Sequence, residues 1–320
     1  MSGDEQSQPP NLSVLLLCWN HAQFLEQCIG SIARQGLQDF EIVFLDNASS
    51  DGSFELARRL FDQFGLKARM IRNDHPASIP ANFNRLLEAS QGQLVAVLST
   101  DDWYDEAYVE SLMKAAADDT EAGWFSCSGW LYFDEQQRSE EVDERRFVTH
   151  RPVGEVILDG GEPHFFVGCA YRRSALEAVG GWDEGQLIED RDLFLRLSRR
   201  FEHHRIAQRL VHYRRNSETA SANAEFMLAG WELFFAKHRQ VFGPRLKARR
   251  AEVYRAYAAL LTDQEDLSAA FTAIKHSLRI RPLNPQSWRT LSYFGRALLI
   301  RSVGKRLRPV KRRGGEPLVH

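Results

Sequence analysis

Two adjacent acids, Asp101 and Asp102, follow an apolar segment at residues 93–98 that is predicted to be a buried strand. Carboxylate oxygens in such a position can bind a hard divalent cation, and water and the phosphates of a ligand fill its remaining positions. A cation held there would neutralise a diphosphate. A solvated turn is the alternative, so the metal hypothesis depends on which other groups share this edge of the sheet.

Polar side chains also follow two other predicted strands. Asp46 and Asn47 come directly after residues 41–45. Asn20 follows residues 13–18. Because α/β sheets bind ligands at the carboxyl ends of their strands, these groups are expected to share one site with the acid pair. Asp46 can accept hydrogen bonds from a nucleobase or a ribose, so a nucleotide diphosphate fits this edge better than a small neutral metabolite does.

A second pair of acids, Glu189 and Asp190, opens a predicted helix later in the chain. A carboxylate at the start of a helix over the pocket can act as a general base and remove the proton of an attacking hydroxyl. Acids in a first helical turn can also serve only as partners of the helix dipole. Trp103 and Trp182 could stack on the flat face of a ligand or pack in the core.

Short motifs of several other enzyme classes are absent from the sequence. It contains no GxGxxG, GxxxxGK[ST], GxSxG or HExxH, which argues against dinucleotide, P-loop, hydrolase-elbow and zinc-protease chemistry. His203, His204 and His212 lack a spaced set of partner ligands, so we do not expect them to bind a metal ion.

The elements that must position these groups follow an alternating pattern over residues 12–102. Short apolar runs, including one at residues 67–71, alternate with amphipathic stretches, as in parallel strands joined by crossover helices. Apolar residues recur at helical spacing before Gly36 and Gly65, where helix ends are expected, and a third helix is predicted at residues 81–90. The pattern predicts an α/β fold with a mostly parallel, Rossmann-like sheet flanked by helices.

Later segments complete this fold and add a helical extension. Residues 123–133 and 165–171 are predicted strands. Residues 254–261 and 269–280 resemble a single tetratricopeptide-type helix pair. Residues 288–308 interleave apolar and basic residues, as an amphipathic basic helix does.

Composition suggests three parts for the chain. Residues 1–11 are polar and expected to be a flexible N-terminus. Residues 12–223 form the predicted main domain, with a ligand-binding half at 12–102 and an acceptor half at 103–223. Residues 224–320 form the helical extension with its basic tail.

Charge is distributed unevenly along the chain. The formal net charge is -2, yet residues 267–315 contain twelve Lys or Arg and no acid. Such a segment favours an anionic partner. No nucleic-acid-binding module accompanies it, so the hypothesis is an anionic membrane surface, and docking of its apolar face onto the main domain is the alternative.

Several features predict a cytoplasmic protein, and the basic tail favours a peripheral position at the inner face of the membrane. The polar, acidic N-terminal segment lacks the basic flank and apolar core of a signal peptide. No apolar run reaches the roughly 18 residues that a membrane span needs. The four cysteines have no CxxC spacing and lie in apolar contexts, so they are predicted to be reduced core thiols. They are Cys18, Cys28, Cys127 and Cys169.

Five segments in order resemble the motifs of family 2 glycosyltransferases, which have the GT-A fold. They are SVLLLCWN from residue 13, EIVFLDNASSDG from 41, NFN from 82 with Gly92, LSTDDWY from 98, and GGWDE from 180 ahead of the second acid pair. The resemblance implies transfer of a sugar from a nucleotide-diphosphate donor to an acceptor hydroxyl, inverting at the anomeric carbon and using Mg²⁺ or Mn²⁺. It also implies a glycan or lipid-linked glycan acceptor, in polysaccharide or glycolipid synthesis.

The same resemblance implies roles for matched residues. Asp46 matches the aspartate that contacts the nucleoside. Asp102 matches the metal ligand of the DxD-type motif, with Asp101 beside it. Asp190 matches the catalytic base of the Glu-Asp motif, next to Glu189. The implied donor-binding residues are Cys18, Asn20, Asp46, Asn47, Asn82 and Asp101.

Three departures from the family pattern leave alternatives open. Ser99 and Asn47 stand where many members have aspartates, and Asn216 replaces a common histidine. Ser99 and Asn216 favour a catalytically silent nucleotide-sugar-binding scaffold as the second hypothesis, although the retained acids argue against it. A nucleotidyltransferase would need an early Gly-rich, basic loop, and this chain has CWNHAQF there. The motifs do not identify the sugar, the nucleobase or the acceptor.

Overall fold

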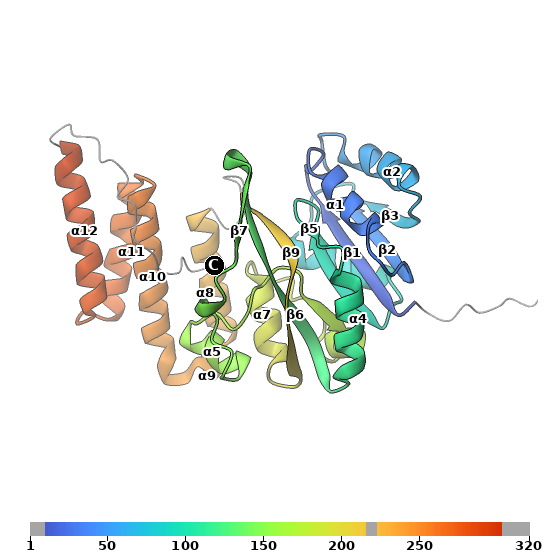
Figure 1. Cartoon of the computed structure of the whole chain (residues 1–320). Helices are drawn as coiled ribbons and strands as arrows, with labels where there is room; N and C mark the ends of the chain where they lie inside the picture. The colour runs from blue at the N-terminus through green and yellow to red at the C-terminus, as the bar shows by residue number, and fades with distance from the viewer. Residues whose placement is uncertain (1–9, 216–222, 303–320) are drawn as a thin grey trace, which may run out of the picture. The chain divides into compact units, whose positions relative to one another are not determined.

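The computed structural model describes residues 10–215 and 223–302, and these form two compact units. The first unit holds the sheet, and the second consists mainly of helices (Figure 1). Most of the predicted N-terminal segment lies outside the described residues. The first unit contains residues 10–157, 161–184 and 189–215, and the second contains residues 158–160, 185–188 and 223–302.

Nine strands of the described residues form one sheet in the order β3-β2-β1-β4-β8-β6-β9-β5, with β7 paired to β6. The first four strands are parallel, as the sequence predicts. Every residue of β1 is buried, because a central parallel strand is covered on both faces. The bounds are β1 (Leu12–Cys18), β2 (Phe40–Asp46), β3 (Ala68–Arg72) and β4 (Leu94–Ser99).

The other half of the sheet mixes parallel and antiparallel pairs. β6 confirms the strand predicted at residues 123–133, and it pairs in parallel with β9. No strand was predicted where β9 lies, because its many bases and histidines hide the apolar alternation. The bounds are β5 (Trp103–Tyr104), β6 (Ala122–Phe133), β7 (Arg138–Glu141), β8 (Ala170–Arg172) and β9 (Glu202–Arg215).

The strand predicted at residues 165–171 is mostly wrong. Only its end belongs to β8, which starts at Ala170. Gly168 has a φ of 73°, in the left-handed region, and this conformation interrupts an extended chain. The apolar residues before it pack as an irregular loop instead.

Crossover helices pack on the parallel strands as their apolar spacing predicts. Side chains of α1, α2 and α4 join one face of β1 and β4 in a single core, which includes Leu16, Ile29 and Phe61. Fully burying such a side chain contributes about 1.5–3 kcal/mol. The helices of the first unit's first half are α1 (Leu25–Ala33), α2 (Ser53–Gln63), α3 (Ile79–Ala89) and α4 (Tyr108–Asp118).

Helices α5 (Val153–Asp159), α6 (Arg173–Val179) and α7 (Glu189–Leu197) follow in the chain. The predicted turn after residue 179 is confirmed, since Gly180 caps α6 with a φ of 82°. The predicted helix beginning at Glu189 is also confirmed.

The second unit contains the predicted helical extension. Helices α10, α11 and α12 lie side by side (Figure 1), and α10 and α11 contain the predicted tetratricopeptide-like pair. Residues 303–308 of the predicted basic helix lie outside the described residues. The helices are α8 (Ala224–Lys237), α9 (Arg239–Phe242), α10 (Leu246–Asp263), α11 (Leu267–Ile280) and α12 (Pro285–Ser302).

Two further expectations concern thiols and membrane spans. All four cysteines are buried and free, as predicted. Among the described residues, no helix combines the length and the apolar character that crossing a membrane requires.

Candidate functional site

Three polar loops meet at the carboxyl edge of the parallel strands, as the sequence predicts. The register pairs Cys18 of β1 with Asp46 of β2, and Leu17 of β1 with Ser99 of β4. The three strands therefore end at one level. The loop after each strand starts beside the other two.

Hydrogen bonds join the loop after β1 to the loop after β2. The backbone N–H of Asn20 donates to Ser49 Oγ at 2.8 Å, and Asn20 Oδ1 accepts from the N–H of Ser50 at 2.9 Å. The N–H of His21 donates to Ser53 Oγ at 3.0 Å. Asn20 has a φ of 54°, a conformation that asparagine tolerates better than most residues. Asn20 thus shapes the rim of the site.

Asp46 ends β2 with an unused acceptor. Its side chain is fully buried, and Oδ1 accepts from the N–H of Ser49 at 2.9 Å. Arg72 Nε lies 3.7 Å from the same oxygen. The other oxygen, Oδ2, is buried and has no hydrogen-bond partner among the described residues. Because an unsatisfied buried oxygen is costly, Asp46 suits a ligand that donates an N–H or O–H.

Asn47 and Asn82 are brought together in a network of amides. Asn73 Nδ2 donates to Asn47 Oδ1 at 2.8 Å and to Asn82 Oδ1 at 2.7 Å. The side-chain amides of Asn47 and Asn82 both donate to the carbonyl of Ala77. Both residues therefore use their amides to hold the segment before α3, beside the Asp46 loop.

Cys18 lies under the rim rather than on it. Burial raises the pKa of its thiol to about 11, and the hydroxyls of Thr100 and Ser53 oppose this shift. The thiol is therefore neutral. Its place at the end of β1 fills the floor of the site.

Asp101 and Asp102 lie after β4, and they differ in surroundings. Asp102 is buried, and its Oδ1 accepts from the backbone N–H of Arg214 at 2.8 Å. Burial raises the pKa of Asp102 well above its usual range, and the negative charge of Asp101 adds to this. Asp101 Oδ1 is buried without a hydrogen-bond partner in the described part of the chain. Asp102 Oδ1 is thus held by a hydrogen bond, whereas Asp101 Oδ1 has none in the described part of the chain.

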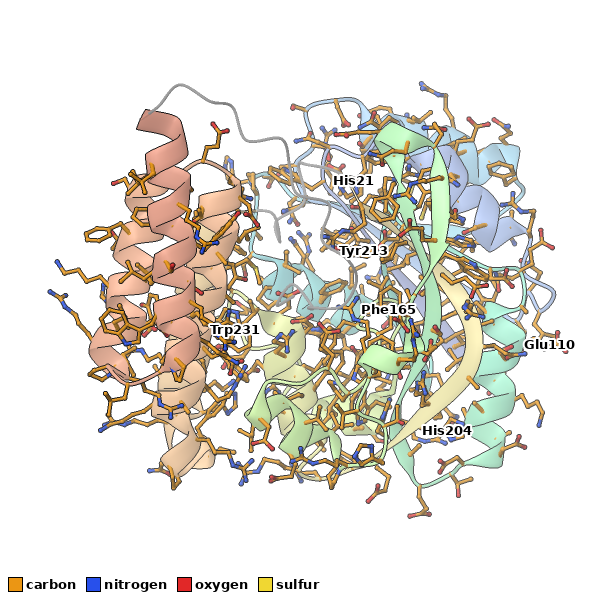
Figure 2. All side chains as sticks on the ribbon, turned by 60° about the vertical axis from the view of Figure 1, so that its left-hand side comes forward. His21, Glu110, Phe165, His204, Tyr213 and Trp231 are labelled. Carbon is orange, nitrogen blue, oxygen red and sulfur yellow. The ribbon has the colours of Figure 1, made fainter. Side chains whose placement is uncertain are left out.

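His21 and Arg214 belong to the site, although neither is among the site residues that the sequence predicts. His21, labelled in Figure 2, places Nδ1 3.0 Å from Thr100 Oγ1 and 3.9 Å from Asp101 Oδ1. Burial lowers the pKa of His21. Arg214 contacts both aspartates from β9. Arg214 belongs to the string YRRN at residues 213–216, which is the sequence signal that could have pointed to it.

The two tryptophans predicted for the acceptor side are packed residues. Trp103 stacks on His212 at a centroid distance of 4.7 Å, and Arg214 lies over its ring at 5.0 Å. Trp182 stacks on Phe83 at 5.2 Å. Both indoles are buried. In this arrangement they support the walls of the site, and sugar stacking by them stays a prediction.

Glu189 and Asp190 begin α7 close to the middle strands of the sheet. The N–H of Val97 in β4 donates to the carbonyl of Cys169 at 3.4 Å. Burial and nearby charges, including that of Asp190, raise the pKa of the Cys169 thiol. Asp190 therefore lies within electrostatic reach of the Cys169 thiol. Burial also raises the pKa of Asp190 itself and, together with the charge of Asp190, raises the pKa of Glu189 to about 8.

The acid pair after β4 fits a cation that is held jointly by the protein and a bound ligand better than a metal ion held by protein side chains alone. Within residues 10–215 and 223–302, no three His, Cys, Asp or Glu side chains are grouped to hold a metal ion. Asp101 and Asp102 supply two carboxylates, one with an unused oxygen. Divalent cations of the Mg²⁺ type are commonly held by one or two carboxylates plus phosphate oxygens and water. The pair thus fits a cation that binds with a nucleotide.

Comparison with known proteins was made on sequence and on structure. The model of the family described as "Glycosyl transferase family 2" matches residues 13–180. EpsH of Bacillus subtilis (strain 168), which is named as a glycosyltransferase, is 24% identical over 174 residues. That match covers 53% of this chain and 49% of EpsH, so the chain spans about half the length of that relative.

Solved structures share the fold. The mannosyltransferase PcManGT from Pyrobaculum calidifontis, solved with GDP-Man and Mn²⁺, has a TM-score of 0.59 at 17% identity, over 91% of this chain and 81% of that one. TarS 1–349 of S. aureus, solved with UDP-GlcNAc, has a TM-score of 0.59 at 12% identity, over 93% of each chain. The expected mostly parallel sheet flanked by helices, with C-terminal helices, is therefore confirmed.

Proposed function

Because the chain belongs to glycosyl transferase family 2, we propose that it transfers a sugar from a nucleotide-diphosphate donor to an acceptor hydroxyl, with inversion at the anomeric carbon. The observation that carries this proposal is the single carboxyl edge where the Asp46 loop and the Asp101-Asp102 pair meet. The first offers an acceptor for a nucleoside, and the second offers carboxylates for a cation at the diphosphate. The acceptor is a glycan or lipid-linked glycan of polysaccharide or glycolipid synthesis.

The donor is held by residues of the first three loops. Asp46 Oδ2 accepts a hydrogen bond from the base or ribose, which satisfies its unused position. Asn47 and Asn82 keep the neighbouring segment in place through Ala77. Asn20 and Cys18 shape the rim and the floor. The nucleoside end therefore lies beside β2, and the diphosphate lies beside β4.

Asp190 is the general base of this proposal. Displacement with inversion requires the acceptor oxygen to attack the anomeric carbon on the face opposite the leaving diphosphate. Asp190 takes the acceptor proton as the carbon–oxygen bond forms, and the bond to the donor phosphate breaks. Glu189 next to it keeps its own proton more readily, because burial and the charge of Asp190 raise its pKa to about 8.

A divalent cation, Mg²⁺ or Mn²⁺, would be held by Asp102 and Asp101. When bound, it supplies positive charge against the diphosphate that leaves. The support for this proposal is the unused oxygen of Asp101 and the fixed side chain of Asp102.

A screen of nucleotides tests the proposed function directly. A nucleoside diphosphate that binds only the folded chain raises its apparent stability, by about 2.7 kcal/mol at a concentration 100 times its dissociation constant. We expect UDP or GDP with Mn²⁺ to raise the melting temperature more than the matching nucleoside does. Measurement is by thermal unfolding, followed by a screen of nucleotide sugars for hydrolysis. A melting temperature that no nucleotide raises above that of the free chain would contradict the proposal. Binding of a nucleotide without hydrolysis or transfer would favour the silent scaffold.

We further propose that the second unit associates with an anionic membrane surface. Six large apolar side chains are exposed between residues 271 and 299, and Trp288 is 53% exposed. No acid occurs between residues 267 and 302, where six bases lie. Apolar groups enter a headgroup boundary, and each nearby base contributes about 1 kcal/mol at an anionic leaflet. The exposed apolar residues are Phe271, Leu283, Trp288, Tyr293, Leu298 and Leu299.

Vesicle sedimentation tests the membrane proposal. We expect the full chain to pellet with phosphatidylglycerol vesicles and to be released by salt, with little pelleting on phosphatidylcholine. A chain that ends at Ser302 keeps all the described helices and loses the six bases of residues 303–320. It should pellet less. Equal pelleting of both chains would show that the basic tail has no part in membrane binding.

A further inference from the structure

We propose that Arg214 is the positioning residue of the Asp101-Asp102 pair, and that its geometry sets the affinity of the site for its divalent cation. The inference rests on the proposed function, because cation binding by the two aspartates is part of that proposal. Arg214 lies near the end of β9, and it is only 4% exposed. It is a positioning residue rather than a catalytic one, because it acts through the aspartates.

Arg214 holds the acid pair at two points. Its backbone N–H donates to Asp102 Oδ1 at 2.8 Å, which selects one orientation of that carboxylate. Its Nε donates to the backbone carbonyl of Asp101 at 2.9 Å, which fixes the loop that carries both acids. The pairing of Trp103 with His212 in β5 and β9 brings β9 alongside this loop. The pair is therefore held from a strand more than one hundred residues further along the chain.

The rest of the Arg214 side chain is fixed just as closely. Nη1 donates to Asp134 Oδ1, and Nη2 donates to Gln27 Oε1. The guanidinium carbon lies 4.4 Å from the ring centroid of Phe24 and 5.0 Å from that of Tyr132. Every nitrogen of the guanidinium thus donates a hydrogen bond, and aromatic rings cover the group. Such a planar group with three fixed directions cannot be replaced by the single ammonium of lysine.

This arrangement explains how two adjacent carboxylates stay ordered in a buried place. The positive charge of Arg214 attracts the carboxyl groups of the pair and opposes part of the cost of burying them. One Asp102 oxygen is occupied by the Arg214 N–H, while Asp101 Oδ1 has no hydrogen-bond partner in the described part of the chain. A cation therefore meets one oriented carboxylate and one unused oxygen.

The chain offers a matched control at the other end of β4, the strand that the acid pair follows. Arg173 donates from all three guanidinium nitrogens, to the carbonyls of Gly92 and Leu87 and to Ser90 Oγ. These contacts lie next to the start of β4, and the Arg214 contacts lie after its end. Arg173→Lys therefore loses a similar number of hydrogen bonds without touching the acid pair.

The test compares Arg214→Lys with Arg173→Lys in the full chain. Binding of Mn²⁺ in the presence of UDP or, separately, GDP is measured from the loss of the free-ion electron paramagnetic resonance signal, and thermal unfolding is measured in parallel. Loss of partners that orient metal ligands typically costs about 10–100-fold in metal affinity. We expect Arg214→Lys to weaken Mn²⁺ binding by that factor, and Arg173→Lys to change it less than about twofold, even where both lower the melting temperature equally.

Gln27→Ala and Asp134→Ala test the same point if Arg214→Lys fails to fold. Each removes one partner of the guanidinium and leaves the metal-binding acids intact, and each should weaken Mn²⁺ binding while Arg173→Lys does not. Mn²⁺ affinity equal to that of the unaltered chain in all of these variants would overturn the inference while leaving the proposed function standing. If the unaltered chain bound neither nucleotide with Mn²⁺, the proposed function and this inference would both fall.

Discussion

Asp190→Asn is expected to abolish sugar transfer while leaving nucleotide binding nearly unchanged. The amide keeps the size of the side chain and cannot take the acceptor proton. General base catalysis contributes about 10²–10⁴-fold, so the rate of transfer should fall by that factor. Transfer is measured with the donor found in the nucleotide screen, and nucleotide affinity is measured on the same preparation. Substantial transfer by the folded variant would reject Asp190 as the base.

Glu110→Gln is the matched control for the helix-dipole alternative. Glu110 is an exposed acid in the first turn of α4, as Asp190 is an acid in the first turn of α7. A dipole partner contributes about 0.3–1 kcal/mol to stability and nothing to chemistry. If Asp190 has only this role, both variants lose a similar amount of stability and keep transfer. If it is the base, only Asp190→Asn loses transfer.

The dependence of transfer on pH provides an independent check. A general base acts only when deprotonated, so transfer should rise with pH and fall as the pH drops through the pKa of the base. Burial raises the pKa of Asp190. An ordinary aspartate has a pKa of about 4. The acid limb of the pH profile should therefore lie above that value. A limb at the ordinary value would contradict the burial of this carboxylate in the working enzyme.

Chelation and Asp102→Ala are expected to produce the second large effect. EDTA should stop transfer, and Mg²⁺ or Mn²⁺ should restore it. Asp102→Ala should weaken nucleoside diphosphate binding by about tenfold or more, because a direct ligand matters at least as much as its outer partners. Binding of the nucleoside alone should change little, since the proposed site holds that part of the ligand at Asp46. Calorimetric titration with UDP or GDP and with the matching nucleoside measures both.

Two further variants separate charge from folding. Asp102→Asn keeps an oxygen that can accept the Arg214 N–H and loses the negative charge. Asp118→Asn removes an exposed acid on α4, where Asp118 pairs with Lys114. We expect the first to share the binding defect of Asp102→Ala and the second to bind normally. Full transfer in EDTA, or normal diphosphate binding by Asp102→Asn, would remove the metal from the proposal.

The local apolar pattern of the sequence alone determined the parallel half of the sheet, which residues 12–102 form. Four strands and their crossover helices lie where apolar periodicity predicted them, because burial on both faces of a parallel strand leaves a direct mark on the sequence. The same pattern placed Asp46 and Asp101 at one edge, since parallel strands end at the same side of a sheet. The start of α7 at Glu189 was readable from its acids and the apolar spacing after them.

What lies around those groups was decided only by tertiary structure. Arg214 reaches Asp102 across 112 residues, and Asn84 holds the backbone of Trp182 across 98 residues. β9 was hidden because its many bases and histidines obscure the apolar alternation of a strand. The sequence by itself therefore determined the parallel strands and the aspartates that follow them at one edge. The fold decided which side chains orient those acids and that both tryptophans pack inside, because contacts between distant segments leave no periodicity in the chain.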